Sequence, residues 1–253
     1  MSFNLLIDLN YDIYRFDKLD STNSHLLKLG NEGFPEGTVV VADEQTMGRG
    51  RFGRKWEAEP LSNLLFSILL RPNYLNPDEI FVLTFAASVA VAEAIEDSVH
   101  IKTELKWPND ILVDSKKVCG ILLESSFSAS GLSHVVLGIG VNVNQEKFSA
   151  EIAGKATSLF ISTGKKYERD EILFLVLKRF SLTLETLRSR NFYSVMKRWR
   201  DRSKIFGKKI KLALSGKTIE GVCDDIGDDG AIIILTADGL QKFTAGEVTI
   251  LET

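Results

Sequence analysis

Residues 48–56 form the densest group of chemically active side chains in this sequence. The segment reads GRGRFGRKW, with four cations and three glycines ahead of a tryptophan. Glycines let a backbone approach a ligand closely, arginines offer forked donors to phosphate or carboxylate oxygens, and a tryptophan face can stack on a purine. The segment is typical of a loop that binds an anionic ligand. A solvated basic hairpin or a general nucleic-acid patch would have the same composition.

A second segment, residues 106–111, joins a cation, an aromatic ring, a rigid turn and two oxygen-bearing side chains. Pro108 places it at a strand end or in a turn, because proline cannot donate to a central ladder. Asp110 is then available for Mg²⁺ or for a ribose hydroxyl. The turn at 114–117 reverses the chain and brings Lys117 back near Asp110. The alternative is a turn that caps the core, with its lysines in solvent.

Three shorter segments carry weaker signals. Residues 21–23, Ser-Thr-Asn, stand at a predicted helix start, where they would cap the helix or donate to a bound carboxylate. Gln45 follows a predicted buried strand that ends at Asp43. Gly138 and Gly140 lie inside another predicted strand, where glycine marks either a close approach or a bulge.

The hydrophobic pattern predicts strands and helices that interleave without a regular βαβ rhythm. β-Branched runs predict strands, and apolar residues spaced by three and four predict helices. This order favours an α+β fold in which helices pack on a mixed sheet. The predicted strands are 10–16, 38–43, 63–71, 103–107, 111–113, 118–125 and 134–143. The predicted helices are 25–30 with a stop at Gly30, a helix opened by Pro77 that runs through 85–95, 167–190 and 191–203.

The pattern changes near Phe206-Gly207. From Lys208 onward the sequence has only short alternating runs separated by turn pairs such as Asp238-Gly239. Short strands joined by hairpin turns predict a small all-β barrel. We therefore expect a first domain over residues 1–204 and a second over 205–253.

Composition and charge narrow the class of protein. Lys and Arg number 31 against 34 Asp and Glu, so the overall charge does not favour nucleic acid or an anionic membrane. The two cysteines and three histidines are scattered, which gives no zinc-type spacing and suits a reducing compartment. The first eight residues do not resemble a signal peptide, and no apolar run is long enough to span a bilayer. We expect a cytoplasmic protein with no membrane partner.

Taken together, the motifs resemble the biotin–protein ligase family. That family has S-T-N, a Gln, G-R-G-R-x-G-R-x-W, K-W-P-N-D, a Lys and G-x-G-x-N in this order. The likeness spans residues 14–253, because the C-terminal part is similar to the family's small SH3-like barrel. Here the motifs are Ser21-Thr22-Asn23, Gln45, Gly48 to Trp56, Lys106 to Asp110, Lys117, and Gly138 to Asn142.

The resemblance implies a role for each of these segments. The helix start and Gln45 would line a biotin pocket, the glycine–arginine segment would close over biotin and its adenylate, and Trp56 would pack on adenine. The implied biotin-binding residues are Ser21, Thr22, Asn23, Gln45, Arg49, Gly50, Arg51 and Lys117. The implied ATP- and adenylate-binding residues are Arg49, Arg51, Arg54, Trp56, Lys106, Asn109 and Asn142. The implied catalytic residues are Lys117, Arg51 and Asp110, and the metal ligands stay undefined.

The implied reaction suits these residue types. The carboxylate of biotin attacks the α-phosphorus of ATP, and because both are anionic the barrier is mainly charge repulsion, which fixed cations and Mg²⁺ relieve. Pyrophosphate leaves, and an ordered loop protects the resulting biotinyl-5′-AMP from water. A lysine of a biotin carboxyl carrier protein domain then attacks the acyl carbon, and AMP leaves.

Two features depart from well-known members of the family. Thr46-Met47 stand between Gln45 and Gly48. Bifunctional members also carry an N-terminal helix-turn-helix domain, whereas only twenty residues precede Ser21. We therefore expect a monofunctional ligase with no sequence-specific DNA partner. Oligomeric state is left open, since homodimers formed through sheet edges occur in the family.

Two other functions share part of the pattern. A lipoate– or octanoate–protein ligase or transferase resembles the biotin ligases in core fold, but K-W-P-N-D together with G-R-G-R-x-G-R-x-W favours biotin. A nucleic-acid-binding module could use the basic loop and the barrel. The sequence pI of about 5.8 and the lack of aromatic residues interleaved across the barrel argue against that reading.

Overall fold

The computed structural model describes residues 11–129, 131–214 and 216–251. The larger part is a seven-stranded mixed sheet with the order β1-β2-β3-β7-β6-β5-β4. Strands β1 and β2 are parallel, and the other neighbours are antiparallel. The strands are β1 (Asp12–Leu19), β2 (Thr38–Gln45), β3 (Leu64–Leu70), β4 (Glu104–Lys106), β5 (Asp110–Val113), β6 (Lys116–Ser128) and β7 (Gly131–Val141).

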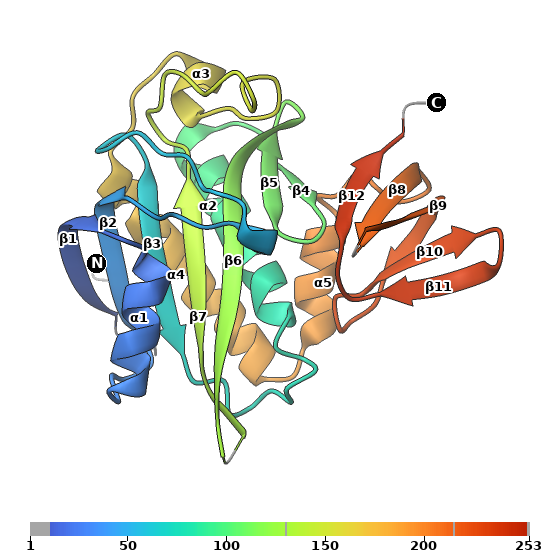
Figure 1. Cartoon of the computed structure of the whole chain (residues 1–253), viewed down its shortest axis with the longest axis horizontal. Helices are drawn as coiled ribbons and strands as arrows, with labels where there is room; N and C mark the ends of the chain where they lie inside the picture. Colours follow the sequence, from blue (N-terminus) through green and yellow to red (C-terminus); the bar gives the residue numbers. More distant parts are fainter. Residues whose placement is uncertain (1–10, 130, 215, 252–253) are drawn as a thin grey trace, which may run out of the picture.

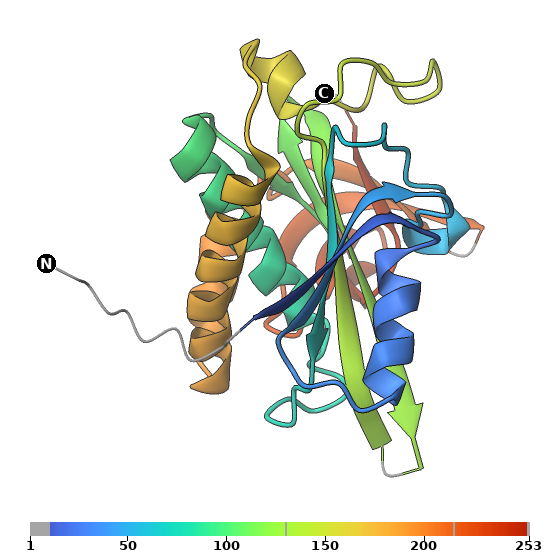
Figure 2. The same cartoon turned by 90° about the vertical axis from the view of Figure 1, so that its left-hand side faces the viewer.

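Helices cover the two faces of this sheet unequally (Figures 1 and 2). On one face lie α2 (Val82–Val99), α4 (Arg169–Arg188) and α5 (Phe192–Arg200). The other face carries α1 (Thr22–Asn31) and the basic segment, which contains the single turn η1 (Arg51–Gly53). A short helix, α3 (Leu159–Thr163), lies beyond one end of the sheet. The second face is therefore the one that can receive a ligand.

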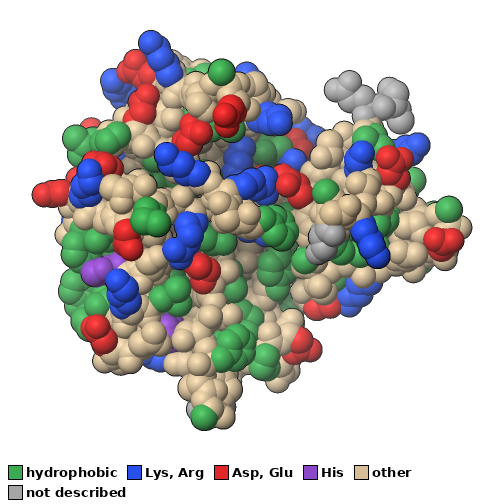
Figure 3. All heavy atoms as spheres, in the orientation of Figure 1, with side chains coloured by type: hydrophobic (Ala, Val, Ile, Leu, Met, Phe, Trp, Pro, Cys, Tyr) green, Lys and Arg blue, Asp and Glu red, His purple; other side chains and the backbone are tan. Residues whose placement is uncertain are grey.

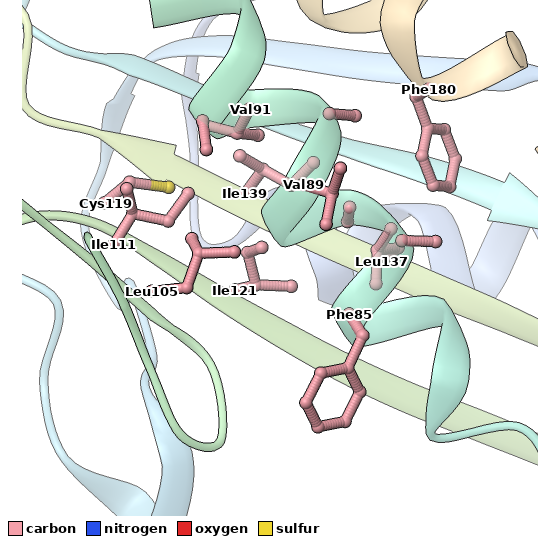
Figure 4. Close-up of a cluster of buried hydrophobic side chains, with 14 of the residues drawn as sticks. Phe85, Val89, Val91, Leu105, Ile111, Cys119, Ile121, Leu137, Ile139 and Phe180 are labelled. Atoms are coloured by element: carbon pink, nitrogen blue, oxygen red, sulfur yellow. The ribbon is translucent and has the colours of Figure 1, made fainter. Parts of the chain in front are cut away.

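Helix α2 is the centre of the core. It is apolar on most sides, and it is buried between the sheet and α4. Figure 4 shows Phe85 and Val89 of α2 beside Leu137 of β7, with Phe180 of α4 close by. Complete burial of one such side chain contributes about 1.5–3 kcal/mol. This packing confirms the predicted α+β class and holds the sheet on which the site is built.

The prediction of where α2 begins is wrong. The helix was expected to open at Pro77, but it begins at Val82. Residues 76–79 form a turn instead, in which the Glu79 carboxylate accepts the backbone N–H of Asn76 at 2.9 Å. Arg190 donates to the same carboxylate at 2.7 Å. A distant arginine therefore holds the local turn that displaces the first turn of the helix.

The predicted helix stop at Gly30 is also wrong. Gly30 is buried inside α1, which continues to Asn31. A Cβ atom at position 30 would stand 2.5 Å from Nε2 of His134 on β7. The glycine is therefore required because helix and sheet approach closely at this point, and not because the chain turns.

The C-terminal region is a separate antiparallel sheet with the order β11-β10-β9-β8-β12. Within the described residues β11 and β12 do not pair, so the predicted barrel is not closed by hydrogen bonds. Its apolar face joins the same buried cluster as α2 and α5, which buries that face without closure. The strands are β8 (Lys209–Leu214), β9 (Lys217–Ile226), β10 (Ile232–Thr236), β11 (Gly239–Phe243) and β12 (Glu247–Ile250).

The two sheets are also joined by Trp107. This residue is 1% exposed, and its indole N–H donates to the Gly230 carbonyl at 2.9 Å. The Trp107–Pro108 bond is cis and forms part of the turn between β4 and β5. For Trp107 the interpretation as a core-capping turn is therefore confirmed.

The cysteines and the helices bear on two further questions, whether a thiol could act as a nucleophile and whether a helix could cross a membrane. Cys119 and Cys223 are buried free thiols. Burial raises the pKa of both, that of Cys223 to about 12, so neither thiol is a nucleophile at neutral pH. In the part of the chain that the structure describes, no helix is both long and apolar enough to cross a bilayer.

Candidate active site

A cavity of about 400 Å³ lies between the α1 face of the sheet, the basic segment and the C-terminal sheet. In the space-filling view, Lys and Arg side chains gather around a hollow at this place (Figure 3). Every residue that the sequence singled out as a site residue lines this one cavity. They are Ser21, Thr22, Asn23, Gln45, Arg49, Gly50, Arg51, Arg54, Trp56, Lys106, Asn109, Asp110, Lys117 and Asn142.

Glycines on β6 and β7 form the floor of the cavity. Gly120 and Gly140 are direct partners in the antiparallel ladder. A Cβ atom would stand 2.8 Å from the Trp56 ring at Gly120 and 2.7 Å from it at Gly140. The paired glycines therefore let the indole lie against the sheet. Because side chains alternate along a strand, Cys119 and Ile121 face the core on the other side.

The helix start forms a neutral, buried end of the cavity. Ser21 is the N-cap of α1, and its Oγ accepts the backbone N–H of Ser24 at 3.4 Å. The Oε1 atom of Gln45 accepts both the backbone N–H and the hydroxyl of Thr22, at 2.7 and 3.0 Å. Ser21 thus fulfils the predicted capping role, while Thr22 and Gln45 are fixed as a pair at the cavity wall.

Ser67 contacts two of the side chains that form this neutral end. It is fully buried in β3, and its Oγ lies 2.7 Å from the hydroxyl of Thr22 and 2.6 Å from Oδ1 of Asn23. The amide nitrogen of Asn23 donates to Glu124 at 2.7 Å. A Cβ atom at Gly138 would stand 2.1 Å from Oδ1 of Asn23, so the third glycine also makes space. Asn23 is consequently fixed in one orientation.

The basic segment folds into a small hairpin. Arg49 and Lys55 form an antiparallel bridge, and the Gly50 N–H donates to the Arg54 carbonyl at 2.7 Å. At the tip, Phe52 has φ 56° and is 65% exposed, a strained conformation for an aromatic residue. The basic segment is therefore a hairpin, as in the alternative interpretation of a solvated basic hairpin, but its arginines line the cavity.

The three arginines of this hairpin have different partners. Arg49 pairs with Glu124 on β6. Arg54 pairs with Glu247 on β12 at 2.8 Å. Arg51 donates to Oδ1 of Asn109 at 3.4 Å and to the Gly246 carbonyl at 3.2 Å. Within the described residues, Arg51 has no carboxylate partner in an ion pair.

Lys117 stands beside the tryptophan. Its ammonium lies 5.3 Å from the centre of the Trp56 ring and 2.5 Å from Oδ1 of Asp110. The backbone of Lys117 is held by the segment 155–157, which accepts its N–H at 2.8 Å and donates to its carbonyl at 2.9 Å. The predicted closeness of Lys117 and Asp110 is confirmed.

Two charged groups of the cavity wall, Arg51 and Glu247, have shifted pKa values. Burial lowers the pKa of the Arg51 guanidinium, and the charge of Asp110 opposes that shift. Burial alone would raise the pKa of the Glu247 carboxyl, but the hydrogen bond and charge of Arg54, with Lys106 and Lys117, outweigh it, so the net shift is downward. An arginine stays protonated at neutral pH and a carboxyl with a lowered pKa stays ionised, so both groups carry charge there.

Two buried polar atoms of the cavity wall have no hydrogen-bond partner within the described residues. They are Nε1 of Trp56 and Oδ1 of Asn142. The amide nitrogen of Asn142 donates to the Thr157 carbonyl at 3.0 Å, which fixes the orientation of its oxygen. A buried polar atom without a partner is costly. A ligand with one donor and one acceptor at these places would satisfy both.

The lining carboxylates do not form a metal cage. Asp110 and Glu247 are both in ion pairs, and the described part of the chain contains no group of three His, Cys, Asp or Glu side chains that could hold a metal ion. Mg²⁺ commonly uses one or two carboxylates together with phosphate oxygens. Asp110 and Glu247 could supply such carboxylates to an Mg²⁺ ion that also binds phosphate oxygens.

Sequence reasoning missed several residues of the site. Ser67 was detectable as the single polar residue in the buried run LLFSILL. Glu247 lies in the C-terminal part of the chain, which the sequence assigned only to the small barrel. Glu124 had no distinguishing pattern. The cavity wall formed by residues 148–156 also had no signal, since it contributes through position alone.

The comparisons with known proteins agree with this geometry. Residues 15–142 match the model of the biotin/lipoate A/B protein ligase family, and residues 205–251 match the biotin protein ligase C-terminal domain. The bifunctional ligase/repressor of Bacillus subtilis is 34% identical over 92% of this chain and 72% of its own length. The biotin–[acetyl-CoA-carboxylase] ligase of Paracoccus denitrificans is 33% identical over 91% of this chain and 97% of its own.

A solved structure is similar over nearly the whole chain. The biotin protein ligase of Aquifex aeolicus in complex with biotin and ATP superimposes with a TM-score of 0.82. It is 33% identical, and the match covers 96% of this chain and 99% of that one.

Proposed function

Because the chain belongs to the biotin/lipoate A/B protein ligase family, we propose that it is an ATP-dependent biotin–protein ligase. It activates biotin to biotinyl-5′-AMP and transfers it to a lysine of a biotin carboxyl carrier protein domain. The observation that carries this proposal is the division of one cavity into two ends. One end is neutral, with polar side chains that hydrogen-bond to one another, and the other is cationic with an aromatic wall.

The neutral end suits the ring of biotin. The ureido group carries one carbonyl and two N–H groups, and it is uncharged. Thr22, Asn23 and Gln45 supply fixed polar atoms at this end, and Ser67 limits their movement. Such a polar lining suits a ureido ring better than the apolar dithiolane ring of lipoate. The lipoate reading is accordingly the second candidate.

The cationic end suits the nucleotide. The partnerless Oδ1 of Asn142 would accept from the exocyclic amine of adenine, while Trp56 would pack on the base. Arg51 and Lys106 would face the phosphates, and Arg54 lies beside them, paired with Glu247. We propose that Mg²⁺ enters as part of the nucleotide substrate, with Asp110 and Asn109 near it. When bound, Mg²⁺ would neutralise phosphate charge.

Lys117 lies beside Trp56 and Asp110, and we propose that the reacting groups of biotin and ATP meet here. Biotin's carboxylate oxygen forms a bond to the α-phosphorus, the bond to pyrophosphate breaks, and negative charge builds on the transferred phosphate. The Lys117 ammonium beside Trp56 would stabilise that charge, and Arg51 would do so from the loop. In the second step a neutral lysine amine attacks the acyl carbon, and AMP leaves with the electron pair.

The remaining features of the proposal concern the whole chain. We place the catalytic domain at residues 1–204 and the C-terminal domain at 205–253, and we propose a cytoplasmic location. We also propose that the chain has no sequence-specific DNA partner, because the basic hairpin is turned into the cavity. Strand β1 is an edge of the larger sheet, and pairing of two copies there would give a homodimer.

Exchange of labelled pyrophosphate into ATP tests the activation step directly. We expect exchange that depends on biotin and does not occur with lipoate or octanoate in its place. Exchange supported by lipoate and not by biotin would establish the second candidate and refute the first. Gel shifts at moderate salt test the claim on DNA, which tight binding to one defined sequence would contradict.

A further inference from the structure

We propose that Glu124 is a positioning residue that anchors the basic hairpin through Arg49 and orients Asn23 at the same time. Glu124 does not line the cavity itself. It lies on β6, on the same face of the strand as Gly120 and Leu122, beyond the neutral end. Its effect on the reaction rests on the proposed function, whereas its effect on the hairpin does not.

The contacts of Glu124 join three segments that are far apart in the sequence. Nη2 of Arg49, in the hairpin, donates to both carboxylate oxygens at 3.1 Å. Nδ2 of Asn23, on α1, donates to Oε2 at 2.7 Å. One carboxylate therefore connects the sheet, the helix start and the loop.

This pairing changes the role expected for Arg49. Its second terminal nitrogen donates to Oγ of Ser24 at 2.8 Å, so both ends of the guanidinium already have protein partners. Arg54 is likewise paired, with Glu247. Arg51 lies between these two anchored arginines and has no carboxylate partner among the described residues. We infer that Arg49 holds the loop, and that Arg51 is the arginine presented to the anionic ligand.

Because the Glu124–Arg49 ion pair is partly buried, its loss should have a measurable effect. The Glu124 side chain is 29% exposed and that of Arg49 is 39% exposed. A single exposed ion pair contributes little. Here, however, the carboxylate accepts from two groups, and its loss would leave the amide of Asn23 without this partner. Loss of Glu124 should therefore both release the hairpin and disturb the neutral end.

The rate of chymotrypsin cleavage after Phe52 measures how readily the hairpin opens, and it requires no ligand. We expect Glu124→Gln to raise the cleavage rate about threefold to tenfold. The substitution removes the negative charge and replaces one of the two acceptor oxygens, to which Arg49 and Asn23 donate, by an N–H donor. Arg49→Gln should raise the rate similarly, and the double variant no further than either. Asp97→Asn is the matched control, because it removes an arginine–carboxylate pair that is far from the cavity.

The ratio of released biotinyl-AMP to biotin transferred is the second readout. We expect this ratio and the KM for biotin to rise in Glu124→Gln while the thermal midpoint stays near that of the parent. Parent-like cleavage in both single variants would overturn the proposal, and so would additive effects in the double variant. If the parent forms no biotinyl-AMP, the proposed function fails, and the cleavage comparison still decides whether Glu124 anchors the hairpin.

Discussion

The two ends of the cavity are built in opposite ways. The neutral end consists of buried and half-buried side chains from α1, β2 and β3 that hydrogen-bond to one another. The cationic end consists of charged, partly exposed side chains from a hairpin, the first residues of β5 and β6, and the C-terminal sheet. The first end is built on packed elements, while the second brings together a hairpin and the ends of strands from both sheets.

This difference matches what each end has to do. An uncharged ring is recognised by polar atoms that are already in place, because any rearrangement would weaken binding. A reaction between two anions needs positive charge around the transition state, and afterwards it needs a cover that opens. We therefore expect substitutions at the neutral end to change biotin binding, and substitutions at the cationic end to change rates and nucleotide binding.

The largest effect is expected at Lys117. Lys117→Ala should lower the rate of biotinyl-AMP formation by about 10²–10³-fold, since it removes a cation next to the developing phosphate charge. The backbone bonds of residue 117 to the segment 155–157 do not need the side chain, so the fold should persist. Single-turnover assays measure the rate, and Lys116→Ala, on the exposed neighbour, is the control. A parent-like rate would show that Lys117 is only a turn residue.

Ser67→Ala is the corresponding test of the neutral end. It removes the Ser67 hydroxyl from the Thr22 hydroxyl and from Oδ1 of Asn23, and each lost bond costs about 1–3 kcal/mol. We expect the KM for biotin to rise about tenfold or more while the KM for ATP changes little. Ser88→Ala is the control, because Ser88 is also buried but bonds only to its own helix. Equal changes in both KM values would mean that the two ends are not independent.

Gly140→Ala tests the floor under Trp56. The added methyl group would stand 2.7 Å from the indole, so the ring must move. We expect the KM for ATP to rise about tenfold, the size of one lost stacking contact. The double variant with Trp56→Ala should be no worse than Trp56→Ala alone. A further loss in the double variant would place the damage in the sheet and not in the ring.

The smallest effect concerns pH. The Glu247 pKa lies below the ordinary value of 4.5, so its pairing with Arg54 is present above that value and is lost as the pH falls through the lowered pKa. Hydrogen exchange of the hairpin amides, corrected for the intrinsic exchange rate at each pH, should thus stay constant from pH 8 to pH 5 and should rise only at more acidic pH. Because both side chains are about half exposed, the rise should be about twofold. Glu247→Gln should abolish this pH dependence.

Much of this protein follows from local sequence. The residue types of the hairpin, the 106–111 turn and Lys117 indicate an anion-binding site, because their chemistry does not depend on what surrounds them. The strands of the larger sheet and helices α4 and α5 also appear near their predicted positions, since hydrophobic periodicity directly reflects which side is buried.

The rest was decided by contacts between distant segments. Ser67 meets Thr22 across 45 residues, Arg49 meets Glu124 across 75, and Arg51 meets Gly246 across 195. The role of Gly30 was misread for the same reason, since its neighbour His134 lies on another element. A local pattern states what a side chain can do, but only the tertiary structure places its partner within hydrogen-bond distance. The sequence therefore determined the chemistry available, and packing decided which of the cavity-lining arginines is paired with a carboxylate.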